Sequence, residues 1–231
     1  MFVLVFAACV IGQPVAAETV LIDDHFDRAD ADPNKESLGP GWSTNSRSRA
    51  KGNKQVWLKD QAMYAERHAV ADHGVSVVHE AAFDDVRIDV RFKLGPRDAL
   101  GLNLADMKES SVHAGHICMA KIRLNSAELT DLKTGRMEKD RRQRRLDGEP
   151  TQADQQRLRA TSKKFPIKLS PNQWHAATLT VRGDTMTLEI DGDAVGEFRS
   201  EGIDHPTKSR LRLAVDRAAW IDDVRLVRLD P

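Results

Sequence analysis

The chain has 231 residues, of which 40 % are hydrophobic and 30 % are charged, and its 35 Lys/Arg residues balance 35 Asp/Glu residues. Balanced charge provides no overall field that would attract nucleic acid, and this length suits one sizeable hydrophobic core. We therefore expect a single domain with no nucleic-acid partner.

Residues 1–17 form an apolar run without a charged side chain, and Val15-Ala16-Ala17 before Glu18 is a small-residue cleavage pattern. The run is shorter than a membrane-spanning helix requires. We predict a signal peptide over 1–17, a mature domain over 18–231, a periplasmic or secreted location, and no membrane contact after cleavage. Cleavage would leave Cys118 as the single cysteine, which excludes an intramolecular disulfide.

The segment after the first short strand, 20–22, is rich in aspartate. Acidic loops supply the oxygen ligands that calcium prefers, so Asp23, Asp24 and Asp27 are candidate calcium ligands. The segment lacks the spacing of a helix-loop-helix calcium loop, and aspartate is also an ordinary turn residue. Calcium is the one cofactor that the sequence suggests, and a solvated loop is the alternative.

Alternating patterns predict strands through the first half of the chain. A hairpin is expected over 56–65 and a strand over 75–78, and residues 86–94 alternate apolar and charged side chains. The polar face of that strand carries Asp89 and Arg91, which could form cross-strand ion pairs or bind the hydroxyl groups of a ligand. Residues 100–105 and 115–124 continue the sheet. On the latter strand, the odd spacing of His113 and His116 would point them to opposite faces, which disfavours a shared zinc site.

Residues 133–164 interrupt the strand pattern with 11 Lys/Arg against 5 Asp/Glu, a net charge of +6. The composition is polar and permits helices, with a short helix expected over 151–160. Because no aromatic residue lies between the basic residues before Phe165, the run offers no stacking platform for single-stranded nucleic acid. We interpret it as a solvated insertion between two strands, with an acidic polysaccharide as its best candidate ligand.

The last third of the chain predicts paired strands over 174–182, 185–190, 194–199, 211–215 and 219–228. Asp191-Gly192 between two of them fits a two-residue type I′ turn, which requires positive φ angles. Glu189 and Asp191 could be taken for the paired carboxylates of a retaining glycosidase. The structural interpretation is stronger, because Asp191 is needed by the turn and Glu189 points outward from the hairpin.

Several motifs together resemble the concanavalin A-like jelly-roll domains of secreted bacterial proteins. They are Phe26-Asp27-Arg28, Leu38-Gly39-Pro40-Gly41-Trp42, the strand 86–94, Asn172-Gln173-Trp174-His175, Asp191-Gly192-Asp193 and Trp220-Ile221-Asp222-Asp223-Val224. The resemblance covers nearly all of 18–231 and is similar in kind to 3-keto-disaccharide hydrolases, laminin-G modules and family 16 glucanases. The Glu-x-Asp-x-x-Glu motif of those glucanases would place its second Glu at Ala194, so their catalytic residues are not carried over.

We thus predict an all-β, two-sheet antiparallel jelly-roll sandwich with a basic, partly helical insertion, and a monomer whose partner is carbohydrate. The concave sheet face would bind a glycan through hydrogen bonds and ion pairs. A glycoside hydrolase or lyase acting on 3-keto-sugars and a structural or adhesive module are the alternatives. The candidate ligand-binding residues are Asp89, Arg91, Asn103, His116, Lys121 and Arg123.

Overall fold

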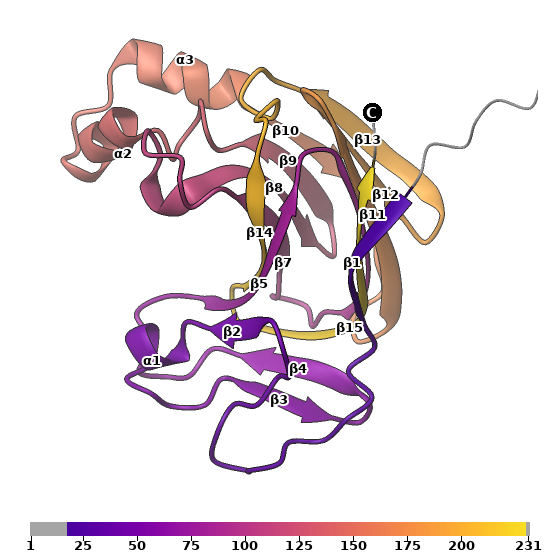
Figure 1. Ribbon diagram of the computed structural model, residues 1–231. Helices are drawn as coiled ribbons and strands as arrows, with labels where there is room; N and C mark the ends of the chain where they lie inside the picture. The colour runs from indigo at the N-terminus through magenta and orange to yellow at the C-terminus, as the bar shows by residue number, and fades with distance from the viewer. Residues whose placement is uncertain (1–17, 230–231) are drawn as a thin grey trace, which may run out of the picture.

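The computed structural model describes residues 18–229, which form two antiparallel sheets packed face to face (Figure 1). The signal-peptide prediction lies outside these residues. Sheet A has the spatial order β13 (Asp193–Arg199), β12 (Thr185–Ile190), β11 (Trp174–Arg182), β6 (Val86–Lys93), β15 (Ala218–Leu229), β4 (Ala62–Glu66) and β3 (Val56–Lys59), with β1 (Glu18–Asp24) also on β15. Sheet B has the order β10 (Ser162–Pro166), β9 (Ser126–Asp131), β8 (His116–Arg123), β7 (Leu100–Ala105), β14 (Lys208–Val215), β5 (Val75–Phe83) and β2 (Trp42–Thr44).

The core lies between the sheets and follows the alternation in the sequence. Along β6 the apolar residues from Val86 to Phe92 are at most 2 % exposed, and the charged residues between them face away from the core. Leu100, Leu102 and Leu104 of β7 are fully buried from the opposite sheet. Side chains from two inner faces interdigitate in this way in a β-sandwich. The predicted jelly-roll sandwich is therefore confirmed.

The predicted hairpin turn at Asp191-Gly192 is also present. Asp191 has a φ of +55° and Gly192 a φ of +85°, and the strands on either side, β12 and β13, are paired. The Asp191 carboxylate accepts hydrogen bonds from the Ala176 amide (2.8 Å) and from the His175 ring (2.7 Å). Asp191 thus holds the hairpin against β11, and Glu189 is exposed, as the structural interpretation of these two carboxylates expected.

The basic insertion contains α2 (Lys139–Leu146) and α3 (Gln152–Ala160), which lie together beyond one end of sheet B (Figure 1). Thr151 caps α3 in a reciprocal capping box with Asp154, which explains where the helix begins. A single helical turn, α1 (Ser46–Arg49), follows β2 on the opposite side of sheet B. No helix among residues 18–229 is long and apolar enough to cross a membrane.

Candidate functional site

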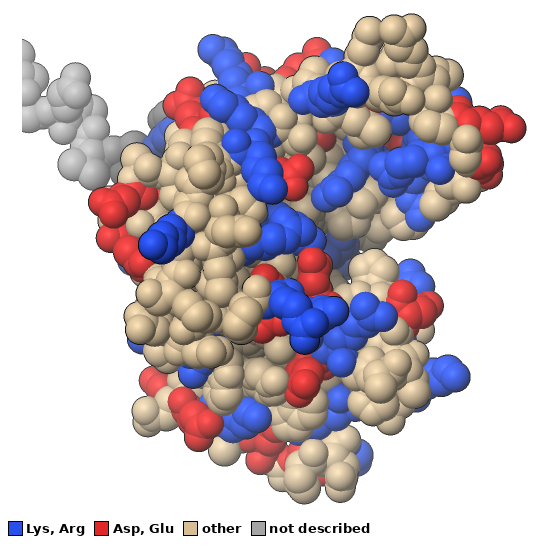
Figure 2. Space-filling model, turned by 180° about the vertical axis from the view of Figure 1, so that it is seen from behind, with Lys and Arg blue, Asp and Glu red and all other residues tan. Residues whose placement is uncertain are grey.

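The largest hollow beside a sheet face lies on the side of sheet B that points away from the core. It has a volume of about 560 Å³ and is lined by β14, β7, the turn before β8, α1 and the residues around His73. Figure 2 shows the surface hollowed between the part formed by α2 and α3 and the part formed by α1, with Lys and Arg gathered beside the opening. We call this hollow the cationic cleft. The basic side chains that line it are Arg49, His73, His113, His116, Arg210 and Arg212.

Three side chains from neighbouring strands meet at the centre of the cationic cleft. Asn103 is 1 % exposed and donates from Nδ2 to the Cys118 carbonyl (3.2 Å), which directs its Oδ1 toward Nδ1 of His116 (3.0 Å). Nη1 of Arg212 lies 3.1 Å from Nδ1 and 3.0 Å from Nε2 of His116, so the guanidinium sits against both ring nitrogens. The arrangement presents a guanidinium and a neutral imidazole to the cleft.

Burial and neighbouring positive charge lower the pKa values of the basic side chains in the cationic cleft. Burial, followed by the charges of Arg212 and His113, lowers the pKa of His116 to about 3. Burial and the nearby Arg210 lower the pKa of Arg212 to about 10. His113 also has a lowered pKa, because of burial and then Arg142 and Arg49. At neutral pH both histidines are therefore neutral, and the positive charge of the cleft is carried by arginine.

Few acidic groups offset this charge. Among the described residues that line the cationic cleft, Asp216 is the one carboxylate, and its Oδ2 lies 2.5 Å from Nζ of Lys121. Arg210 pairs with Glu80 at the edge. The charge of Glu80 also acts on Arg212, which forms no ion pair of its own with a carboxylate of residues 18–229. A partly buried arginine without an anionic partner is costly unless a ligand supplies the negative charge. The cleft is therefore suited to an anion.

The turn before β8 corrects the prediction that His113 and His116 point to opposite faces. Residues 113–115 form a short 3₁₀ turn in which Ala114 and Gly115 have φ angles of +51° and +70°. A Cβ on Gly115 would lie 2.3 Å from the Asp106 carbonyl, so only glycine fits there. The turn brings both imidazoles to the cleft, with ring centroids 6.5 Å apart.

The predicted ligand-binding residues divide between the two sheets. Asn103 and His116 line the cationic cleft, and Lys121 reaches its edge through Asp216. Arg123 lies farther along β8, opposite Ser126 of β9, and does not line the cleft.

Asp89 and Arg91 do not join the other four residues, because β6 belongs to sheet A. Asp89 accepts hydrogen bonds from Arg87 (3.2 Å) and Thr178 (2.8 Å). Arg91 lies near Asp222 (3.4 Å) and Asp223 (3.1 Å). The prediction of one shared binding face was wrong for these two residues. Arg91 forms the cross-strand ion pairs that were the alternative, whereas Asp89 pairs with Arg87 of its own strand.

Sequence reasoning missed Arg212, Arg49 and His73. The signal for Arg212 was present, because Arg210 and Arg212 alternate with the buried leucines of β14. The other two lie outside regular strands, on α1 and in the segment before β5, and nothing in their local sequence points to a cleft.

The aspartate segment does not gather its carboxylates around one point. Both oxygens of Asp24 accept from Arg28 (2.7 and 2.8 Å), and one also accepts from the Trp42 indole (2.8 Å). Asp23 lies 3.5 Å from the His25 ring. Within residues 18–229 no group of three or more His, Cys, Asp or Glu could hold a metal ion. Calcium binding by Asp23, Asp24 and Asp27 thus remains a prediction without a ligand cluster to support it.

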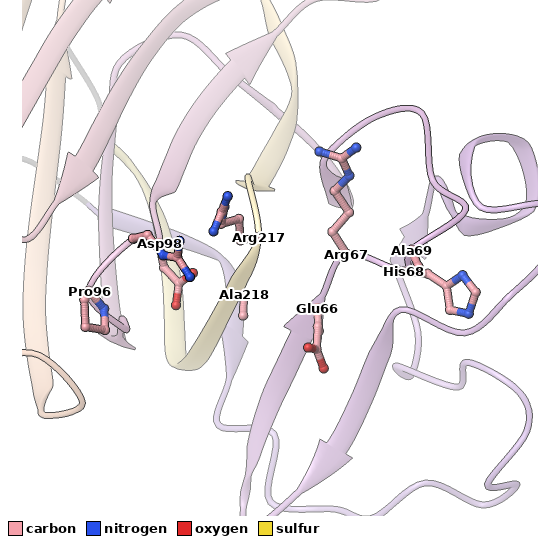
Figure 3. Close-up of a pocket in the computed structure, with 9 residues that line it drawn as sticks. Glu66, Arg67, His68, Ala69, Pro96, Asp98, Arg217 and Ala218 are labelled. Carbon is pink, nitrogen blue, oxygen red and sulfur yellow. The ribbon is translucent and has the colours of Figure 1, made fainter.

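A second hollow, of about 470 Å³, lies at the end of the sandwich where β4, the turn after β6 and the turn before β15 meet. Figure 3 shows that its side chains do not converge: Arg67 and Glu66 point in opposite directions and His68 points away from Asp98. A site for a specific ligand requires several polar groups directed at one place. The cationic cleft is therefore the stronger candidate.

Comparison with known proteins places the fold. No protein-family model matches the chain, and no curated protein does. Among solved structures, the laminarinase from Rhodothermus marinus is similar with a TM-score of 0.60 and 12 % identity, over 94 % of this chain and 100 % of that one. The catalytic domain of a laminarinase from Thermotoga petrophila has a TM-score of 0.56 and 14 % identity, over 94 % and 100 %. A sialidase matches 90 % of this chain with 18 % of its own, at a TM-score of 0.57 and 9 % identity. The chain has the concanavalin A-like jelly-roll fold that these likenesses share.

Proposed function

We propose that this protein is an extracytoplasmic carbohydrate-binding module that holds an acidic polysaccharide in the cationic cleft. The observation that carries the proposal is Arg212, which is held at the centre of the cleft by His116 and has no carboxylate partner among the described residues. Charge-assisted hydrogen bonds from arginine suit the carboxylate of a uronic acid or the sulfate of a sulfated sugar.

The lining of the cleft supports recognition by charge and hydrogen bonding. Among the described residues that line it there is no Trp, Tyr or Phe, so the cleft offers imidazole rings in place of the usual aromatic platform for a sugar. Ser48 and Ser76 add hydroxyl groups that can bond sugar hydroxyls, while the amides of Asn45 and Asn103 are bonded within the protein. This composition favours a hydroxyl-rich polyanion over a neutral glucan.

The similar structures agree with a carbohydrate partner. The similar structures reported above are named as laminarinases and a sialidase, which are enzymes that act on carbohydrates. The apolar run over 1–17 supports a location in the periplasm or outside the cell, where polysaccharides are encountered.

A glycan array tests this proposal directly. The purified protein is applied to sulfated polymers, uronic-acid polymers and the neutral glucan laminarin. We expect saturable binding to the acidic polymers and none to laminarin. Equal binding to laminarin, or no binding to any acidic polymer, would contradict the proposal. A parallel array with chelator tests the aspartate segment, because loss of binding on chelation would support calcium at Asp23, Asp24 and Asp27.

The alternative is an enzyme, a hydrolase or lyase acting on oxidised or 3-keto sugars, and His116 is the observation that favours it. A general base works best with a pKa near the working pH, so His116, with a pKa of about 3, would be a weak base beside a guanidinium that could polarise a carbonyl group. The two-carboxylate mechanism of glycosidases has less support, because the described lining of the cleft contains one carboxylate, Asp216, which pairs with Lys121. Release of shorter or unsaturated products from a bound polymer, absent in His116→Gln, would identify the enzyme.

A further inference from the structure

A smaller cavity lies under the helical insertion, next to the cationic cleft. Its volume is about 250 Å³, and it is enclosed by β9, the segment after it, both helices and the start of β10. The residues that line it are Glu128, Thr130, Arg136, Arg145, Leu158, Thr161 and Ser162.

Two polar atoms of this cavity are buried without a partner. Thr130 is 4 % exposed, and its Oγ1 forms no hydrogen bond with any described residue. Nε of Arg136 is likewise buried and unbonded. Buried polar atoms are normally hydrogen-bonded, so two unsatisfied donors that line one cavity indicate a missing partner there. Nε of Arg136 can only donate and the Thr130 hydroxyl is able to donate, so one acceptor group such as an anion could satisfy both.

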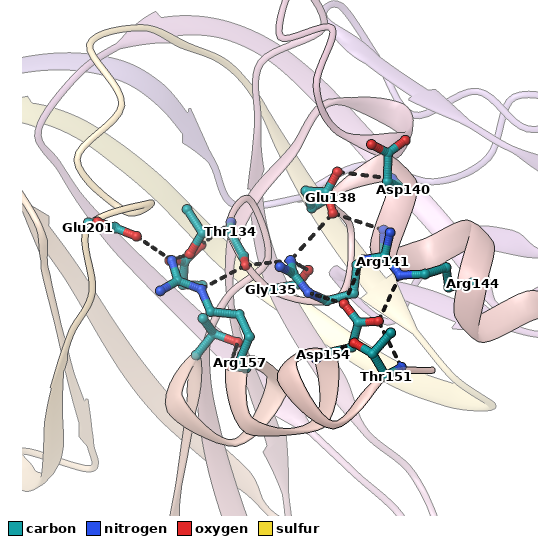
Figure 4. A network of polar contacts seen from close by, with 12 residues as sticks. Thr134, Gly135, Glu138, Asp140, Arg141, Arg144, Thr151, Asp154, Arg157 and Glu201 are labelled. Carbon is teal, nitrogen blue, oxygen red and sulfur yellow. Dashed lines mark hydrogen bonds and ion pairs between the residues drawn. The ribbon is translucent and has the colours of Figure 1, made fainter. Parts of the chain in front are cut away.

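The neighbouring arginines of the insertion have structural roles. Arg144 donates to both oxygens of Asp154, at 2.8 and 2.6 Å, and Arg157 pairs with Glu201 (Figure 4). Arg141 bonds the carbonyls of Thr134 and Gly135. Each of these arginines lies beside a carboxylate, which belongs to the insertion for Arg141 and Arg144 and to the segment after β13 for Arg157.

Arg136 and Arg145 differ from that group. Neither forms an ion pair with a carboxylate of residues 18–229, and both line the cavity. Arg145 has a lowered pKa, because of burial and then the charges of Arg136 and Arg142. Glu128 also lines the cavity and offsets one of the two arginine charges. The cavity therefore keeps an excess of positive charge.

The strand register aligns this cavity with the centre of the cationic cleft. Arg212 lies opposite Asn103, Asn103 opposite Met119, and Met119 opposite Thr130, so one row crosses β14, β7, β8 and β9. Three strand spacings separate Arg212 from Thr130, a distance of about 14 Å. A chain of several sugar residues laid across the strands would reach both places, whereas a disaccharide would not span the row.

We propose that the cavity of Thr130, Arg136 and Arg145 is a second anion subsite, which takes a sulfate or carboxylate of the same polysaccharide that Arg212 binds. The inference rests on the proposed function and deepens it, because two separated subsites select a polymer with repeated negative charges. The helical insertion then acts as the element that measures chain length and charge spacing.

The experiment compares a heparin-derived disaccharide with a heparin-derived octasaccharide by isothermal titration calorimetry. In the double variant Arg136→Gln/Arg145→Gln, we expect the octasaccharide affinity to fall about tenfold while the disaccharide affinity stays unchanged. Arg159→Gln is the matched control, because it removes one charge from an exposed position on α3. Thr130→Val and Arg145→Gln remove no hydrogen bond of the free protein, so they test the cavity if the double variant does not fold. Each should weaken octasaccharide binding about threefold.

Three outcomes would overturn the inference. Unchanged octasaccharide binding in the double variant and in Thr130→Val would show that the cavity takes no part, while the proposed function would stand. A loss no larger than that of Arg159→Gln would show a general effect of charge. Failure of the unmodified protein to bind either oligosaccharide would remove the proposed function, and the subsite with it.

Discussion

The outer faces of the two sheets are both rich in basic residues, but these residues have different partners on the two faces. On sheet A, Arg87 bonds Glu18 (2.9 Å) and Asp89, Arg91 lies near Asp222 and Asp223, and Lys93 lies over the rings of Trp220 (4.5 Å) and Trp174 (5.1 Å). On sheet B, Arg212 lies against neutral histidines and Arg136 and Arg145 lack an acidic partner among the described residues. The charges on the outer face of sheet A have partners within the protein. The positive charge on the outer face of sheet B needs a ligand to neutralise it.

The difference shows why a count of charged residues does not locate a binding site. Cross-strand ion pairs and cation–π contacts on an exposed face contribute little and attract no ligand. Arginine held in a hollow without a counter-charge creates a local positive potential even in a chain with no net charge. Whether a charged side chain can bind a ligand depends on its partners in the protein and on how deeply it is buried.

The largest expected effect concerns a buried carboxylate at the end of β9 that does not line the cationic cleft. Asp131 is fully buried and accepts hydrogen bonds from the Thr134 amide (2.9 Å), Ser200 (2.6 Å) and the Gly202 amide (3.1 Å). Asp131→Ala would leave these donors unsatisfied, and we expect the free energy of unfolding to fall by about 3 kcal/mol. Urea unfolding measures this, with exposed Asp193→Ala as the control. An equal loss in both variants would show that Asp131 has no special structural role.

The next prediction tests the difference between the outer faces of the two sheets. Arg212→Gln should lower the affinity for heparin at least tenfold, because it removes the central charge of the cleft, an effect of about 1.4 kcal/mol or more. Arg91→Gln removes the same charge from sheet A and should leave the affinity unchanged. Titration calorimetry at low salt measures both. A similar loss in the two variants would mean that binding follows overall charge, and the distinction between the faces would fail.

Two histidines, one on each sheet, should respond to pH in opposite directions. The pKa of His116 is lowered from an ordinary value of 6.5 to about 3, so its stabilising contribution is present above pH 6.5 and is lost as the pH falls toward 3. Burial alone would lower the pKa of His175, but hydrogen bonds to Asp191 and to the Ser170 carbonyl raise it. Its contribution is present below pH 6.5 and is lost as the pH rises through its raised value.

Unfolding measured at about pH 7 and about pH 4.5 tests this contrast. His116→Gln should lose less stability on acidification than the unmodified protein, because it lacks a group that must be protonated on unfolding. His175→Gln should lose more, because it lacks a group that stabilises the acidic form. The same pH dependence in all three proteins would contradict both assignments.

The smallest effect is expected on sheet A. Lys93→Met removes the ammonium group over Trp174 and Trp220 but keeps the apolar part of the side chain, so the loss of unfolding free energy should be about 1 kcal/mol or less. Lys168→Met, at an exposed position, is the control. A loss of several kcal/mol in thermal unfolding would show that these contacts matter more than the comparison allows.

Local patterns were enough to predict most of the framework. Period-two alternation located β6, β12 and β14, an apolar run located β11, and the Asp-Gly turn between β12 and β13 has the positive φ angles that were expected. The short helix α3 was also expected, from the polar, helix-permissive composition of 151–160. In contrast, β9 and β10 were not recognised, because Ser126–Asp131 and Ser162–Pro166 are short and mixed in polarity and become strands by pairing with each other and with β8.

What the sequence determined by itself is the class of fold, the positions of most strands and the basic character of the insertion. Each of these depends on neighbouring residues and on which side of a strand is buried. Only the tertiary structure decided that Asn103, His116 and Arg212 meet while Asp89 and Arg91 lie on the other sheet. Alternation of apolar and polar residues indicates that one side of a strand faces solvent, but it does not indicate which strands lie beside that strand. That choice is made by pairing between residues about a hundred positions apart, as between β7 and β14, and it is this pairing that builds the cationic cleft.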